Sequence, residues 1–132
     1  MPAKKEVISI GPPLAPFTLK LSAPAQDDLI RILAWTQQAF GDAGRVRYES
    51  LIGTALSDLR KDPGRAGVRQ RPDIGKGVCT YHLASSRKRV GSSEQVAQPR
   101  HFVLFRVSGQ VIEVARLLHD AMDFIRHAVR SR

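Results

Sequence analysis

The stretch LSAPAQDDLIRILAWTQQAFGDAGRVRYESLIGTALSDLRKDPG, residues 21–64, decides the fold of this chain. Its apolar residues recur at spacings of three and four, a pattern that predicts two amphipathic helices. Ser22 stands at the expected N-cap of the first helix, and Gly41 is placed to end it. Asp42 can cap the second helix, which Pro63 stops. Two helices joined by so short a turn form an antiparallel hairpin, whose apolar face must pack on another layer.

Strands on both sides of the hairpin supply that layer. Short runs with apolar alternation predict four strands, at residues 17–21, 78–84, 102–107 and 111–118. The last two are joined by Ser108-Gly109-Gln110, a short hairpin signal. A short C-terminal helix is expected from His119 to about residue 129. This order of elements predicts an α+β fold in which the helical hairpin packs on a mostly antiparallel four-stranded sheet.

Three further segments show no periodic pattern. Residues 1–16 contain four prolines and are expected to form a flexible N-terminal extension. Residues 65–77 are a basic, glycine-containing connection. Residues 85–100 are polar and rich in turn residues, which predicts a mobile loop insertion. The chain is therefore expected to hold one domain, residues 17–129, and its length of 132 residues allows hardly more.

Composition is typical of a globular protein of the cytoplasm. Hydrophobic residues make up 42% of the sequence, and no apolar run is long enough to span a bilayer. Prolines break the apolar patch near the N-terminus, which argues against a secretory signal peptide. The single cysteine, Cys79, can form neither an internal disulfide nor a cysteine-based metal site, and we expect a small buried strand residue.

The net charge of +9 is also the net charge of the C-terminal part alone. Residues 60–132 contain fifteen basic and six acidic residues, whereas residues 23–59 contain three basic and five acidic ones. Such a layout indicates an acidic partner for the C-terminal part, either nucleic acid or an acidic protein. Charge by itself is equally explained by solubility.

Four motifs resemble the ParE branch of the ParE/RelE toxin superfamily. The most specific is VIEVARLLHDAMDFIRH at residues 111–127, similar to the ParE signature of a terminal strand with Arg, then Leu-His, two residues and Met-Asp. LSAPAQDDLIRI (21–32) resembles the start of the family's first helix, and FGDAGRVRY (40–48) its inter-helix turn. HFVLFRV (101–107) resembles the penultimate strand, with Phe105 in place of a common Tyr. Together they cover nearly the whole chain in the family's order.

The resemblance implies the toxin of a type II toxin–antitoxin module, neutralised by a small ParD-like antitoxin in a hetero-oligomer. Characterised ParE proteins inhibit DNA gyrase by trapping it on cleaved DNA and are not known to catalyse a reaction. DNA gyrase is therefore the implied target, with no cofactor, membrane or small-molecule substrate. Two alternatives stay open. One is a RelE-type ribosome-dependent mRNA endoribonuclease, and the other a non-toxic module that binds antitoxin within a repressor complex.

Cleavage of RNA would need a general base, a general acid and cations for the phosphate. His82, His101, His119 and His127 are the candidate acids and bases. Neither tyrosine lies in the expected terminal helix, so that helix lacks the catalytic residues expected of a RelE-type enzyme. A metal site is not expected either, because only His119 and Asp123 stand at ligand spacing, and such a pair is more often a surface ion pair.

Polar and basic residues around the last strand and helix are the candidate target-binding surface. They are Arg116, His119, Met122, Asp123, Arg126, His127 and Arg130. The competing interpretation is structural, and it fits each residue type at least as well. In it His119 caps the last helix and Asp123 pairs with Arg116 or Arg126.

An acidic, amphipathic antitoxin segment would need cations and apolar anchors. The candidates are Arg60, Arg65, Arg69, Arg71 and Trp35. Trp35 lies off the main apolar stripe of the first helix and is more simply explained as a partly buried edge of the core. The run from Arg87 to Arg89 is more simply explained as a solvated loop tip.

Overall fold

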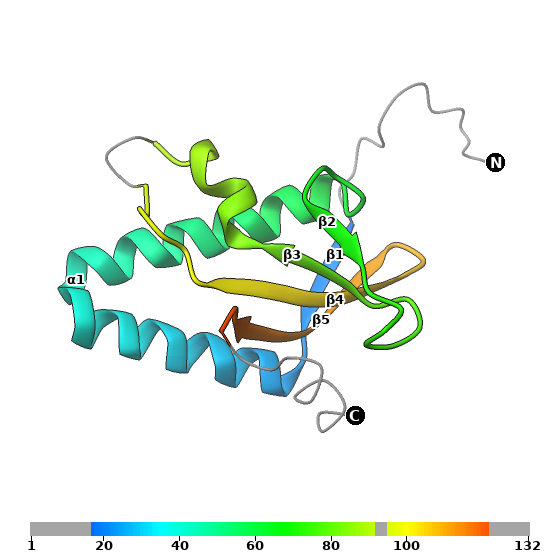
Figure 1. The fold of residues 1–132 in the computed structure, drawn as a ribbon, viewed down its shortest axis with the longest axis horizontal. Helices are drawn as coiled ribbons and strands as arrows, with labels where there is room; N and C mark the ends of the chain where they lie inside the picture. The colour runs from blue at the N-terminus through cyan, green and yellow to red at the C-terminus, as the bar shows by residue number, and fades with distance from the viewer. Residues whose placement is uncertain (1–16, 92–94, 122–132) are drawn as a thin grey trace.

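A long helix folded back on itself packs against a five-stranded sheet (Figure 1). The computed structural model describes residues 17–91 and 95–121 of the chain. The helical elements are α1 (Ala23–Lys61) and the short 3-10 helix η2 (Leu83–Arg89). The strands are β1 (Thr18–Leu21), β2 (Val68–Gln70), β3 (Cys79–His82), β4 (His101–Ser108) and β5 (Val111–His119). No helix among these residues is both long enough and apolar enough to cross a membrane.

The two arms of α1 confirm the predicted helical hairpin. Ser22 caps the first arm, and its hydroxyl oxygen accepts a hydrogen bond from the backbone N–H of Ala25 at 3.1 Å. Gly41 interrupts the helix with a φ of 79° and a ψ of −176°, a conformation that residues with a Cβ rarely adopt. The chain reverses there, so the second arm runs back beside the first (Figure 1).

The sheet has five strands in the order β1-β5-β4-β3-β2, not the four expected from the sequence. The missed strand is β2, which lies in the segment expected to be a connection. It pairs antiparallel with β3, Val68 opposite Tyr81. Because β2 is an edge strand that leaves Arg69 and Gln70 in solvent, it carries no apolar alternation that a sequence pattern could detect.

The direction of one strand also departs from expectation, because the sheet is mixed. β1 pairs in parallel with β5, Thr18 opposite Val111, while all other neighbours are antiparallel. The backbone N–H of Ser22 extends this pairing by donating to the carbonyl of Val114. An apolar pattern reports which face a strand buries and not the direction in which it runs, so the parallel pair could not be predicted.

The core lies between α1 and the facing side of the sheet. Its largest fully buried side chains come from both layers and include Leu51, Leu59, Tyr81, Phe105 and Ile112. The expectation that Tyr81 is a core residue is thus confirmed, whereas Cys79 is only half-buried. On the other side of the sheet a smaller apolar cluster is built from Ile74, Val78 and Leu104.

A buried carboxylate in the first arm of α1 ties the helical hairpin to β5. Asp28 accepts hydrogen bonds from the Arg116 guanidinium at 2.7 and 3.0 Å, and from the backbone N–H of Leu117 at 3.0 Å. Its side chain is only 5% exposed, and that of Arg116 is 16% exposed. Burial of a carboxylate is tolerated when a cation and hydrogen-bond donors replace its water, as they do here.

A second buried carboxylate, Asp58 in the other arm, holds η2. It accepts hydrogen bonds from the Ser86 hydroxyl at 2.7 Å and from Arg89 Nε at 2.9 Å, and it pairs with Arg65 at 3.3 Å. The hydroxyl groups of Ser86 and Tyr81 are also hydrogen-bonded, at 2.7 Å. The described part of residues 85–100, the expected loop insertion, therefore begins with a helical turn that is packed against α1.

β5 runs one residue further than expected, to His119, which pairs with His101 at the start of β4. His119 therefore ends a strand, and the prediction that it begins a helix is wrong. The described residues stop at Ala121. The remainder of the expected C-terminal helix and the N-terminal extension, residues 1–16, lie outside the described residues.

Removing the Asp28 carboxylate should destabilise the protein strongly. Asp28→Ala leaves the Leu117 N–H and the Arg116 guanidinium without their buried acceptor, which we expect to lower the free energy of unfolding by about 3 kcal/mol. Asp27→Ala is the matched control, because Asp27 is exposed one position earlier on the same helical turn. The readout is the urea midpoint of each variant. Equal midpoints would show that the buried carboxylate does not hold the fold together.

Candidate functional site

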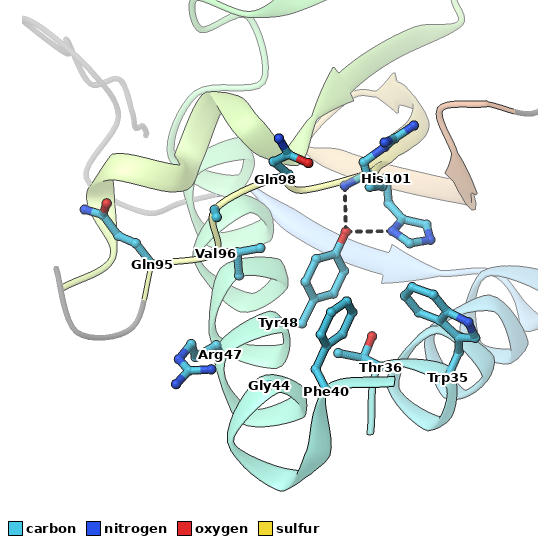
Figure 2. A pocket seen from close by; sticks show the side chains of 12 residues that line it. Trp35, Thr36, Phe40, Gly44, Arg47, Tyr48, Gln95, Val96, Gln98 and His101 are labelled. Carbon is cyan, nitrogen blue, oxygen red and sulfur yellow. Dashed lines mark hydrogen bonds between the residues drawn. The ribbon is translucent and has the colours of Figure 1, made fainter. Parts of the chain in front are cut away.

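An aromatic groove opens where the turn between the arms of α1 meets the chain entering β4 (Figure 2). Its volume is about 600 Å³, and its lining includes Trp35, Phe40 and Val96. Trp35 and Phe40 are 53% and 66% exposed, and their rings meet edge to face with centroids 5.8 Å apart. Exposed aromatic side chains gathered at a concavity mark a surface for an apolar binding partner.

The groove has cationic as well as aromatic lining. Arg47 from the second arm and Arg100 from the segment before β4 both line it and are exposed. Gly44 lets Phe40 pack closely at the floor of the groove, because a Cβ at position 44 would collide with the Cβ of Phe40. The groove therefore combines an apolar floor with positive charge, which suits a partner that has apolar and acidic side chains.

The inner wall of the groove is a buried hydrogen bond between Tyr48 and His101. The Tyr48 hydroxyl lies 2.6 Å from His101 Nδ1 and accepts a hydrogen bond from the backbone N–H of Arg100 at 3.1 Å (Figure 2). Burial raises the pKa of Tyr48 to about 12. Burial, aided by the neighbouring His119, lowers the pKa of His101 to about 4. Because the Tyr48 oxygen already accepts from Arg100 and Nδ1 of His101 lies within reach of the phenol proton, we assign the phenol as the donor and the ring proton of His101 to Nε2.

Behind this wall lie two more histidines and one carboxylate. The His101 and His119 rings meet edge to face with centroids 5.2 Å apart. Asp120 joins the cluster through His82 Nε2 at 3.0 Å and Arg100 Nε at 3.2 Å. Although burial acts to raise it, these two hydrogen bonds lower the pKa of Asp120 overall. Three of the chain's four histidines thus gather at one end of the sheet.

Local backbone contacts fix the tautomers of the other two histidines. His82 Nδ1 accepts a hydrogen bond from the backbone N–H of Ala84, and His119 Nδ1 accepts one from the N–H of Ala121, each at 3.0 Å. Both rings consequently carry their proton on Nε2, as His101 does. Among the described residues, no group of three or more His, Cys, Asp or Glu side chains is placed to hold a metal ion.

Comparison with known proteins identifies the family. The family model described as "ParE toxin of type II toxin-antitoxin system, parDE" matches residues 19–124. The chain belongs to the ParE toxin family. Its fold is similar to that of a chain from the chromosomal ParDE toxin–antitoxin system of P. aeruginosa, with a TM-score of 0.57 and 19% identity over 78% of this chain and 95% of that one.

A second solved structure is more distant. A chain of the toxin–antitoxin complex RelBE2 from Mycobacterium tuberculosis has a TM-score of 0.45 and 19% identity, covering 79% of this chain and 98% of that one. No curated protein matches the sequence. The family model therefore carries the assignment, and the first solved structure supports the fold.

Of the seven candidate target-binding residues of this ParE-family chain, Arg116 and His119 lie among the described residues. Arg116 turns toward α1 and pairs with Asp28. His119 belongs to the histidine cluster at the end of β5. The other five, Met122, Asp123, Arg126, His127 and Arg130, lie outside the described residues.

The candidate antitoxin-binding arginines are mostly engaged within the fold. Arg65 pairs with Asp58, Arg71 pairs with Asp73 at 2.6 Å, and Arg60 Nε donates to the carbonyl of Phe17. Arg69 is exposed on the edge strand β2.

Trp35 is not the partly buried core edge favoured by the sequence. It is half exposed and lines the groove.

Sequence reasoning missed most of the groove and the whole histidine cluster. Tyr48 and His101 are 53 positions apart, and nothing in the local pattern joins them. A usable signal did exist for the histidines. His82 lies near the end of one predicted strand, His101 precedes the next and His119 follows the last. In an antiparallel meander those three ends meet at one edge of the sheet.

The imidazole of His101 should stay neutral to unusually low pH. Its pKa of about 4 in the folded chain lies below the ordinary value of 6.5. The stability that this provides is complete above about pH 6.5 and is lost as the pH falls towards 4, by up to about 3 kcal/mol. Histidine ring resonances followed by NMR should show one ring that does not titrate near pH 6.5.

His101→Gln is the matched variant for this titration. It should remove that late-titrating signal and flatten the fall in unfolding free energy between pH 6.5 and 4. A His101 ring that titrates near its ordinary value in the wild type would contradict the buried hydrogen bond with Tyr48.

Proposed function

We propose that this chain is the toxin of a type II toxin–antitoxin module, that it inhibits DNA gyrase, and that a ParD-like antitoxin neutralises it. Membership of the ParE family supports the first part, and the resemblance of residues 111–127 to the ParE signature implies the target. The observation that carries the antitoxin part is the exposed Trp35–Phe40 groove with its two arginines.

The groove is better suited to an antitoxin segment than the stretch from Arg60 to Arg71. Binding of an amphipathic segment requires apolar anchors, and the groove offers two large exposed aromatic rings, Trp35 and Phe40. Arg47 and Arg100 then receive carboxylates of the partner. The similar P. aeruginosa chain comes from a ParDE toxin–antitoxin system, which supports an antitoxin as the partner.

We propose that the target surface lies at the end of β5. His119 presents its Nε2–H there, with Asp120 and Arg100 beside it. The candidates Met122, Asp123, Arg126, His127 and Arg130 follow in the sequence. Charged and hydrogen-bonding groups at the rim of such a surface set specificity for a protein or DNA partner.

Inhibition by binding is better supported than RNA cleavage. A general base needs a free lone pair, but Nδ1 of His82, His101 and His119 each accepts a hydrogen bond. These rings can donate from Nε2, yet each must give up a structural hydrogen bond before it accepts a proton. The cluster thus suits a structural and binding role, which favours a non-enzymatic toxin.

Expression of the toxin gene alone in a bacterium tests the proposed target. Pulse labelling just after induction should show DNA synthesis falling before RNA and protein synthesis, together with a DNA-damage response. An early fall in protein synthesis would favour the ribonuclease alternative. If no synthesis rate falls, the chain is a non-toxic binding module.

The proposed antitoxin site can be tested with a pair of exposed apolar residues. Trp35→Ala should weaken antitoxin binding by at least about tenfold, because it removes an anchor from the groove. Ile30→Ala is the matched control, since Ile30 is 67% exposed on the same helical arm and does not line the groove. Calorimetric titration of both variants with the co-encoded antitoxin gives the comparison. Equal loss, or no loss, in the two variants places the antitoxin elsewhere.

A further inference from the structure

In contrast to the apolar groove, one edge of the molecule is strongly basic. It comprises the last turn of α1, residues 62–73 with strand β2, and η2. Its cations are Arg60, Lys61, Arg65, Arg69, Arg71, Arg87, Lys88 and Arg89, and the carboxylates in the same segments are Asp58, Asp62 and Asp73. We call this set the η2 edge.

Internal pairing accounts for only part of that charge. Asp58 is shared by Arg65 and Arg89, and Asp73 is taken by Arg71. Lys61, Arg69 and Lys88 are exposed and have no carboxylate partner among the described residues. A surplus of unpaired cations on one edge creates a positive field that attracts an anionic partner.

The helix that carries this charge is held firmly. Leu83 and Ser86 of η2 are fully buried, and Ser86 is hydrogen-bonded to both Asp58 and Tyr81. Arg89 is fixed at Nε by Asp58, while 52% of its side chain remains exposed. Because η2 is already ordered, cations displayed on it reach a partner with less loss of conformational entropy.

Two hollows with charged and hydroxyl side chains in their lining adjoin η2, one at each of its ends. The first, about 410 Å³, is lined by Ser50, Thr54 and Ser57 together with Lys61 and Arg89, and Asp58 is its single acid. The second, about 440 Å³, is lined by Arg69, Arg71, Thr80, His82 and Ser85, with Asp120 as its single acid. Arginine, lysine and hydroxyl side chains are the groups that contact phosphate oxygens of nucleic acids.

We infer that the η2 edge binds the phosphate backbone of duplex DNA without reading its sequence. An acidic protein segment is a poorer fit, because the exposed aromatic anchors lie in the Trp35–Phe40 groove instead. A single strand is a poorer fit too. Its bases need aromatic rings on which to stack, and the rings nearest the hollows, Tyr81 and Phe102, are buried. The choice of DNA over duplex RNA rests on the proposed action at DNA gyrase.

The test measures binding of the full-length chain to a short fluorescent duplex by anisotropy, at several salt concentrations. The variant is Lys61→Gln with Lys88→Gln, two exposed residues whose loss breaks no ion pair among the described residues. We expect affinity to fall roughly tenfold or more, and the slope of log affinity against log salt to shrink by about 2. Lys20→Gln with Lys76→Gln removes the same charge outside both hollows, and should change affinity less and leave the slope nearly intact.

Each other outcome overturns the inference. An unchanged slope in the Lys61/Lys88 variant shows that this edge does not contact phosphates. Weaker binding to the antitoxin with unchanged binding to DNA shows that the edge serves a protein partner. Tighter binding of duplex RNA or of a single strand by the wild-type chain shows that DNA is the wrong ligand. Because the assay contains no gyrase, its result is independent of whether gyrase proves to be the target.

Discussion

The carboxylate of Asp28 is the interaction on which the arrangement of the two layers depends. It lies in the first arm of α1, and its bonds to Arg116 and to the N–H of Leu117 reach 88 and 89 residues along the chain. Apolar packing between a helix and a sheet is non-directional, so it leaves the position of one layer on the other weakly specified. A buried carboxylate without its partners costs several kcal/mol of folding free energy, so its hydrogen bonds fix the position of the helix on the sheet. The register between β4 and β5 shifts beside the pair of Leu104 and Arg116.

Asp58 fixes the position of the second arm of α1 in the same way. The end of the molecule near Asp58 is basic, whereas the end at the turn of the hairpin is apolar. Near Asp58, polar and basic groups gather around η2, because the buried carboxylate recruits Arg65, Arg89 and Ser86. At the turn of the hairpin there is no such anchor, and large apolar side chains of the arms remain exposed. The proposed antitoxin groove and the proposed DNA-binding edge are therefore distinct surfaces. In this proposal the antitoxin binds through apolar contacts, whereas the affinity of the basic edge for DNA depends on the salt concentration.

The histidine cluster links the groove to the end of the sheet. Tyr48 fixes His101, the rings of His101 and His119 touch, and Asp120 collects His82 and Arg100. A partner that moves Tyr48 or Arg100 in the groove would therefore disturb the residues at the end of β5, where the target surface is proposed. The hydrogen bond from Tyr48 to Nδ1 of His101 fixes the orientation of that ring.

The sequence by itself determined the helical hairpin, most of the strands and the family. Helical spacing, the Ser22 cap and Gly41 are local signals, and the structure has both arms, the cap and the left-handed glycine where they were expected. Four motifs in the family's order were together sufficient to recognise a ParE-like chain, and the family model that matches residues 19–124 confirms the family. Local signals suffice in these cases because the relevant interactions lie within a few residues of one another.

Only the tertiary structure decided the fifth strand, the parallel pair, the partner of Arg116 and the groove. β2 becomes a strand because β3 offers it backbone partners, and its own residues show no preference that predicts this. Arg116 was expected at a binding surface, but a guanidinium takes whichever carboxylate the fold brings to it, and that is Asp28. Trp35 was expected at the core edge, yet exposure depends on what the rest of the chain leaves uncovered. Contacts between distant residues set these features, and no pattern within a short window records them.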